Sequence, residues 1–194
     1  QYLDQNKEAE ERIYEGETPG VSYGDIAERY YTVGQYMKEV KDVSKAMAAA
    51  GDSYICDEYL NAMGSPEAES VYVLHDLNND GIEEFFIGLK FNYDIPYYVI
   101  YDVYTWKDGR AYQLMRGIGY RNGSCKICEN GVIEDNYSGS AWDGQTLYHI
   151  LPEGGIELET IDSVSSRRDG TVQSYYHWNE LIDEKSLQTI LEQY

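Results

Sequence analysis

The segment at residues 76–84 has the residue types and the spacing that a hard metal cation requires. Oxygen-bearing side chains stand at alternate positions as Asp76, Asn78 and Asp80, and a glycine follows them directly. Ile82 can offer its backbone carbonyl, and Glu84 adds a further carboxylate. Calcium binds roughly six to eight oxygens at about 2.3–2.6 Å, and a tight loop turns alternate side chains toward one centre.

Calcium is the cation that this pattern predicts. Gly81 suits the sharp turn, because a Cβ would obstruct the backbone there. Magnesium fits less well, since it prefers fewer protein ligands in an ideal octahedron. We therefore predict a calcium site whose ligands are Asp76, Asn78, Asp80, Glu84 and the carbonyl of Ile82.

The other interpretations of the same loop are an EF-hand and an acidic hairpin. An EF-hand is excluded, because its bidentate glutamate position falls on Ile87 and the flanking segments are typical of strands. The second alternative is an acidic hairpin, in which the Asp and Asn side chains only accept hydrogen bonds from their own backbone. The sequence leaves this alternative open.

Most of the chain around the loop has a strand pattern. Short apolar or alternating runs are separated by turn signals such as Asp108-Gly109 and Asn130-Gly131, with no helix between them, which predicts an antiparallel meander. In residues 97–104 we expect the face that carries Asp102 to be the wetter one. The predicted strands cover residues 71–74, 85–89, 97–106, 110–115, 127–129, 132–134, 146–151, 156–161 and 172–178.

Helices are predicted at both ends of the chain. Ser22 and Asp25 form a capping box, and an apolar stripe from Ile26 to Met47 predicts one long helix over residues 22–50. A shorter helix is expected over residues 53–63. Asp183 should cap a C-terminal helix with an apolar face at Leu187, Ile190, Leu191 and Tyr194.

The predicted fold class is α+β. N-terminal helices pack on one antiparallel meander sheet of about five to eight strands, and a short C-terminal helix closes the chain. Residues 1–20 are expected to be an N-terminal polar segment, a short helix or a frayed end followed by a linker. Residues 21–194 form the single α+β domain.

The negative charge of the chain restricts the kinds of molecule that it can bind. Asp and Glu total 35 against 15 Lys and Arg, a formal charge of −20, which repels nucleic acid and anionic lipid. No apolar run approaches the ~18 residues of a membrane span. The chain starts in a polar stretch without a signal peptide, so we expect that a leader was removed, and an N-terminal lipid anchor would precede Gln1.

The tyrosine, cysteine and histidine residues are the remaining side chains that could take part in binding or catalysis. The 21 tyrosines suit strands with one wet face, and exposed ones can also stack on sugar rings. Cys125 and Cys128 have the CxxC spacing, but in a strand they point to opposite faces, which disfavours redox chemistry and chelation. His75, His149 and His177 are scattered and do not indicate a catalytic site.

Residues 71–158 resemble known secreted proteins. The pattern of strand, Asp-x-Asn-x-Asp-Gly-x-x-Glu and strand in residues 73–88 is similar to the calcium loop of integrin-type FG-GAP and VCBS repeats. It also resembles secreted or lipid-anchored proteins of uncharacterised function from gut Firmicutes, which share a hairpin like residues 101–109 and an Asn-Gly-x-Ile turn like residues 130–133. The loop occurs once, so propeller function is not implied.

These observations together predict a secreted or surface-anchored, calcium-stabilised module that acts by binding a protein or a glycan and not by catalysis. The first alternative is a hydrolase that uses acidic residues on a glycan or cell-wall substrate. A purely structural or inhibitory domain is the second alternative. Acidity, the calcium loop and the resemblance support the extracellular location.

Overall fold

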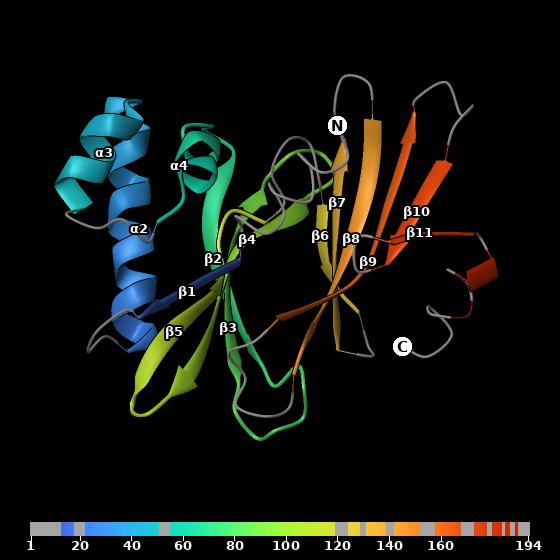
Figure 1. Cartoon of the computed structure of the whole chain (residues 1–194). Helices are drawn as coiled ribbons and strands as arrows, with labels where there is room; N and C mark the ends of the chain where they lie inside the picture. The colour runs from blue at the N-terminus through green and yellow to red at the C-terminus, as the bar shows by residue number, and fades with distance from the viewer. Residues whose placement is uncertain are drawn as a thin grey trace.

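The computed structural model of the chain is an α+β structure with helices, a first sheet and a second sheet side by side (Figure 1). It describes residues 13–17, 22–50, 55–118, 124–128, 131–138, 142–151, 158–167, 173–177, 180–183, 185–186 and 189. The predicted α+β class and the antiparallel strand pairing are confirmed. No helix within these ranges is long and apolar enough to cross a membrane.

The first sheet has five strands in the order β1-β5-β4-β3-β2. It is formed by β1 (Ile13–Glu17), β2 (Ala68–His75), β3 (Glu84–Phe91), β4 (Tyr97–Lys107) and β5 (Arg110–Met115). Strand β1, which pairs antiparallel with β5, was not predicted, and it extends this sheet into the segment expected to precede the domain. The domain boundary itself stays a prediction.

The second sheet has six strands in the order β11-β10-β9-β8-β7-β6. These are β6 (Ser124–Ile127), β7 (Val132–Ser138), β8 (Trp142–Ile150), β9 (Leu158–Arg167), β10 (Gln173–His177) and β11 (Glu180–Ile182). The prediction of a single sheet was therefore wrong. The Asn130-Gly131 signal marked the β6–β7 hairpin, whereas β11 was not predicted, and turn signals do not show where a meander divides.

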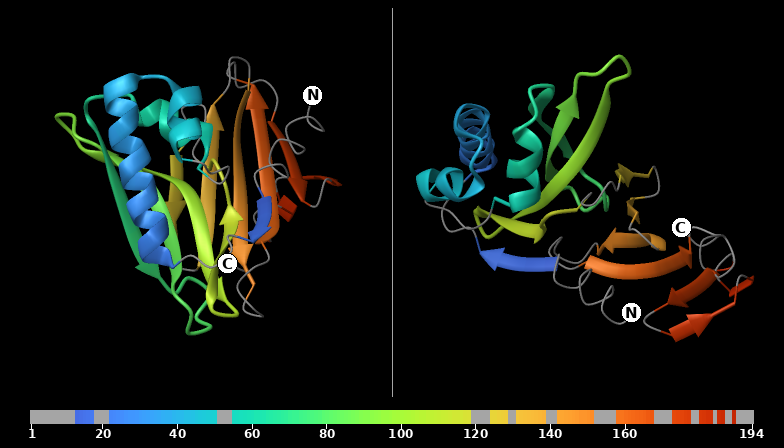
Figure 2. Two further views of the ribbon diagram at one scale, coloured as in Figure 1. Left: turned by 90° about the vertical axis from the view of Figure 1, so that its left-hand side faces the viewer. Right: turned by 90° about the horizontal axis from the view of Figure 1, so that it is seen from above.

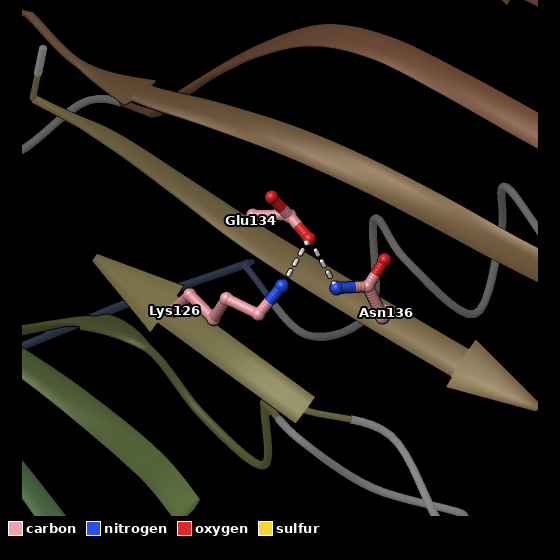
Figure 3. A network of polar contacts seen from close by, with 3 residues as sticks. All are labelled: Lys126, Glu134 and Asn136. Atoms are coloured by element: carbon pink, nitrogen blue, oxygen red, sulfur yellow. Dashed lines mark hydrogen bonds and ion pairs between the residues drawn. The ribbon is translucent and has the colours of Figure 1, made fainter. Parts of the chain in front are cut away.

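On β6 and β7 of the second sheet, polar side chains form a cross-strand network (Figure 3). Glu134 accepts hydrogen bonds at Oε1 from Nζ of Lys126, at 3.1 Å, and from Nδ2 of Asn136. Lys126 is directly opposite Glu134 in the strand register. Lys126 is exposed and Glu134 is half-buried, and a pair of this kind contributes little to stability, at most about 1 kcal/mol.

In the part of the chain that the structure describes, three helices precede β2: α2 (Tyr23–Val40), α3 (Val43–Ala50) and α4 (Asp57–Met63). The capping box of Ser22 and Asp25 at the start of α2 is confirmed. The single helix predicted over residues 22–50 was wrong, because Lys41 adopts a left-handed conformation with φ of 52° and ends α2. Asp42 then caps α3 by accepting a hydrogen bond from the backbone N–H of Lys45 at 3.1 Å.

The predicted C-terminal helix is described only in part. The Oδ1 of Asp183 accepts a hydrogen bond from the backbone N–H of Ser186 at 2.8 Å, which is the capping contact that the sequence predicts. The expected apolar face of that helix lies outside the described residues.

The first sheet is covered on both faces. One face and helices α2 and α4 share the first core, in which Tyr30, Tyr59 and Tyr104 are fully buried. The opposite face and strands β6–β8 share the second core, which contains Leu77, Phe86, Val103, Leu114, Met115, Ile118, Cys125, Ile133, Tyr148 and Ile150.

The expectation that the Asp102 face of β4 is the wetter one was wrong, because Asp102 is completely buried. Ile87 pairs with Asp102 and Gly88 with Ile100, so Tyr101 is an extra residue that changes the alternation of β4. Tyr101 and Tyr104 accordingly both join the first core. Gly88 is required opposite this bulge, since a Cβ there would lie 2.2 Å from the Val99 carbonyl oxygen.

A hydrogen-bond network surrounds the buried carboxyl group of Asp102. It accepts bonds from Tyr30 Oη at 2.6 Å and from the Gly117 backbone N–H at 3.0 Å. Tyr30 and Tyr104 hydroxyls are 2.9 Å apart, and the Nε2 of Gln113 donates to the Tyr104 hydroxyl at 2.9 Å. Burial raises the pKa of Asp102 to about 6, although these hydrogen bonds and the charge of Arg116 act in the opposite direction.

This raised pKa predicts a pH dependence that Asp102→Asn removes. The unfolded carboxyl has a pKa near 3.9, so the folded protein holds the proton more tightly between about pH 4 and pH 6. Across that window the free energy of unfolding falls with rising pH, by an amount on the order of 3 kcal/mol, and the loss is complete above pH 6. Urea unfolding from pH 4.5 to 7 should show this fall in the natural protein and a flatter profile in the variant. Parallel profiles would contradict the assignment.

Candidate cation-binding loop

The loop predicted to bind calcium connects β2 to β3, whose terminal residues His75 and Glu84 pair directly. It lies at the lower end of the first sheet in Figure 1. Asn79 and Gly81 adopt positive φ angles of 59° and 88°, so the backbone curls back twice within a few residues. A curled backbone of this kind brings alternate side chains to its inner side.

Hydrogen bonds within the loop hold three of the predicted ligands together. The two carboxylate oxygens of Asp76 accept from the backbone N–H groups of Asp80 and Gly81, at 3.1 and 3.0 Å. Asn78 accepts at Oδ1 from the Asp80 N–H at 3.0 Å, and its Nδ2 donates to Asp80 Oδ2 at 2.9 Å. Asp80 in turn accepts at Oδ1 from the Ile82 N–H at 2.8 Å.

Glu84, the fourth side-chain ligand of the prediction, is the first residue of β3 and is completely buried. Its Oε2 accepts from the Leu77 backbone N–H at 2.9 Å, and its Oε1 accepts from Thr105 Oγ1 at 3.3 Å. Burial, with a further contribution from the charge of Asp80, raises the pKa of Glu84 to about 7. The carboxyl group therefore lies behind the loop, where a nearby positive charge would stabilise its ionised form.

The arrangement matches the self-bonded acidic hairpin that the sequence left open. Within the described residues, which include Asp76, Asp80 and Glu84, no three His, Cys, Asp or Glu side chains gather closely enough to hold a metal ion. The oxygens that accept backbone N–H groups keep lone pairs, because each carboxylate offers about four acceptor positions. The calcium site accordingly stays a prediction, and it requires the carboxyl groups to move toward one centre.

The loop also contacts the second sheet, which the sequence did not show. Leu77 is 3% exposed and belongs to the second core. The Nδ2 of Asn78 donates to the carbonyl oxygen of Leu151, which follows β8, at 3.1 Å. Gly131, directly before β7, comes so close that a Cβ there would lie 2.6 Å from the Leu77 carbonyl oxygen. The loop therefore fills the junction between the two sheets.

The cysteine and histidine side chains, which could also take part in chemistry, do not form a second site among the described residues. Cys125 is buried in the second core, whereas Cys128 packs beside Val132 and Leu147, and all three cysteines of the chain are free. Burial raises the pKa of the Cys125 thiol well above its ordinary value, so it is a poor nucleophile. His75 is exposed, and the side chain of His177 lies outside the described residues.

Comparisons with known proteins return no counterpart of this fold and loop. No family model matches the chain, and no curated protein or solved structure is found to be similar to it. The resemblance of residues 73–88 to FG-GAP and VCBS calcium loops therefore rests on the sequence pattern alone.

The contact between Gly131 and Leu77 predicts that Gly131→Ala destabilises the protein strongly. The alanine would have to adopt a φ of 82° and would also push against the Leu77 carbonyl oxygen. Gly109→Ala is the matched control, because Gly109 has a similar φ of 77° and no atom within 4 Å of the added Cβ. We expect urea unfolding to show a loss of about 1 kcal/mol for the control, from backbone strain alone, and a loss larger by about 1–3 kcal/mol for Gly131→Ala. Equal losses would show that the loop does not press on β7.

Proposed function

We propose that the protein is an extracellular or cell-surface module that acts by binding, and that calcium holds its 76–84 loop rigid. N-terminal helices covering the first sheet and the loop between the sheets provide the scaffold of this module. The ligands of calcium are Asp76, Asn78, Asp80 and Glu84 with the Ile82 carbonyl. A protein or a glycan is the binding partner.

One observation carries the calcium proposal. Asp76, Asn78 and Asp80 are joined by hydrogen bonds through three successive backbone N–H groups, those of Asp80, Gly81 and Ile82. These side chains are therefore grouped on one turn, and the charge of Asp80 acts on the buried Glu84. Placing carboxylates together without a cation costs free energy, because like charges repel most strongly where water is excluded. A divalent cation removes that repulsion.

The extracellular setting fits the expected affinity. Loops with few carboxylates in extracellular modules bind calcium with dissociation constants of about 10⁻⁴–10⁻³ M. Such a site is filled only where calcium is millimolar, which favours a secreted or surface-anchored protein. The resemblance to secreted and lipid-anchored proteins with a similar loop supports the same location.

A binding role is favoured over the acidic hydrolase that the sequence also allowed. Burial raises the pKa of two carboxyl groups described here, Glu84 and Asp102. Glu84 shares its sheet face with Phe86 of the second core, whereas Asp102 is bonded to Tyr30 of the first core. Two carboxyl groups on opposite faces of a sheet do not act as a catalytic pair on one substrate.

Calcium should raise the melting temperature of the protein. At 10 mM calcium and a dissociation constant near 10⁻⁴ M, binding to the folded state alone adds about 2.7 kcal/mol. For a chain of this size that corresponds to a rise on the order of 5–10 °C, and magnesium should give a smaller rise. Differential scanning calorimetry in calcium, magnesium and chelator measures these shifts.

A matched pair of variants locates the effect. Asp80→Asn removes one charge from the loop but keeps an oxygen for the Ile82 N–H, so the calcium response should largely disappear while the fold persists. Asp108→Asn removes the same charge from the β4–β5 turn, where a φ of 52° suits asparagine, and should leave the response intact. Identical melting in calcium and chelator, with no heat of calcium binding, would refute the proposal.

A further inference from the structure

The β3–β4 hairpin carries an aromatic platform, formed by Phe91, Tyr93 and Tyr97. The three rings are nearly parallel: Phe91 and Tyr93 are inclined by 2°, Phe91 and Tyr97 by 18°, and Tyr93 and Tyr97 by 17°. Their centroids lie 4.9 to 6.2 Å apart. Phe91 is 7% exposed and anchors the group in the first core, whereas Tyr93 and Tyr97 are 49% and 47% exposed.

The platform is presented to solvent by the shape of the molecule. Figure 2 shows the tip of the β3–β4 hairpin projecting from the body, and the view from above shows it pointing away from the second sheet. Ile95 at the tip is 83% exposed. Stacking among the three rings offsets the entropy cost of holding them parallel, and about half of Tyr93 and of Tyr97 stays exposed to solvent.

The net charge of the chain and the small exposed area of the platform restrict which ligands can bind there. A chain with a formal charge of −20 repels nucleic acid and anionic membranes, so the ligand is neutral or basic. A stable protein interface needs about 800 Å² on each partner, which two half-exposed rings on a projecting tip do not supply. A pyranose ring needs only one or two aromatic faces.

We propose that this aromatic platform binds a neutral, β-linked glycan chain by stacking, an inference that rests on the proposed binding function and names its ligand class. Sugars with equatorial hydroxyls, such as β-linked glucose and xylose, carry axial C–H groups on both ring faces. These weakly positive hydrogens are attracted to the negative faces of Tyr93 and Tyr97.

Polar side chains beside the platform suit the hydroxyl groups of such a chain. Asn92 and Asp94 flank Tyr93 and are exposed. The amide of Asn92 is oriented by its Nδ2, which donates to the Glu67 carbonyl at 3.4 Å and to Glu69 Oε2 at 3.3 Å. Amide and carboxylate oxygens at the edge of a flat apolar surface accept hydrogen bonds from equatorial hydroxyls, which project in the plane of the sugar ring.

Affinity electrophoresis of the full chain in gels containing mixed-linkage β-glucan or xylan tests the proposal. The natural protein should be retarded relative to a gel without polysaccharide. Tyr97→Ala should weaken the binding about threefold to tenfold, and Tyr97→Trp, which keeps a flat ring, should retain it. Unchanged melting of the variants shows that they fold.

Tyr98→Ala is the matched control. Tyr98 is adjacent in sequence and 63% exposed, but it lies on the opposite face of β4, so its removal should leave retardation unchanged. No retardation in either gel, or equal loss in Tyr97→Ala and Tyr98→Ala, would overturn the glycan proposal. Binding to phosphatidylcholine vesicles that is lost in Tyr97→Ala would overturn it in favour of a lipid surface.

Failure of this proposal is distinguishable from failure of the calcium proposal. The platform lies where Phe91 pairs with Ala68, at the opposite end of β2 and β3 from the pair of His75 and Glu84 that borders the loop. Asp80→Asn should therefore lose the calcium response and keep the glycan binding.

Discussion

Burial of the β3–β4 pair on both faces is the constraint on which the rest of the structure depends. Helices α2 and α4 cover one face and the second sheet covers the other, so Phe85 and Phe86 are consecutive residues in different cores. Polar groups on these strands are consequently shut away from water, and buried polar groups are tolerated only with hydrogen-bond partners. Asp102 and Glu84 each have such partners.

The same double burial attaches the loop at residues 76–84 to the body of the protein. Leu77 belongs to the second core, and its backbone N–H is bonded to Glu84 at the base of the loop. Asn78 reaches the end of β8. A cation bound to this loop would therefore stabilise the junction of the sheets as well as one turn, since the loop is attached to both.

Local sequence signals predicted the elements well where the signal itself is local. The capping box at Ser22, the turn signals and the strand runs on either side of the loop correspond to what the structure contains. Asp42 is a good helix cap and was a sequence signal for the break at Lys41. The apolar stripe continues past Asp42, and for that reason one long helix was predicted. The bulge at Tyr101 and the burial of Asp102 could not be predicted, because the bulge changes the alternation of β4 and Asp102 then meets Tyr30 of α2, a residue distant in sequence.

For the candidate site, the sequence suggested ligand residues but gave nothing of their setting in the fold. The spacing of Asp76, Asn78 and Asp80 predicted that their oxygens converge, and the hydrogen bonds show these side chains grouped around one turn. The contact of Gly131 with Leu77 joins residues distant in sequence, and no spacing rule contains that information. The aromatic platform was visible only as a high tyrosine content.

A calcium titration followed by nuclear magnetic resonance tests the central claim most directly. The backbone amides of Asp80, Gly81 and Ile82 donate to the predicted ligands, so their signals report any movement of the carboxylates. We predict that these signals shift on addition of millimolar calcium and saturate with one bound ion, while the amides of β9 and β10 stay unchanged. Loop signals that do not move up to about 10 mM calcium would contradict the account, because an extracellular site would be filled at that concentration.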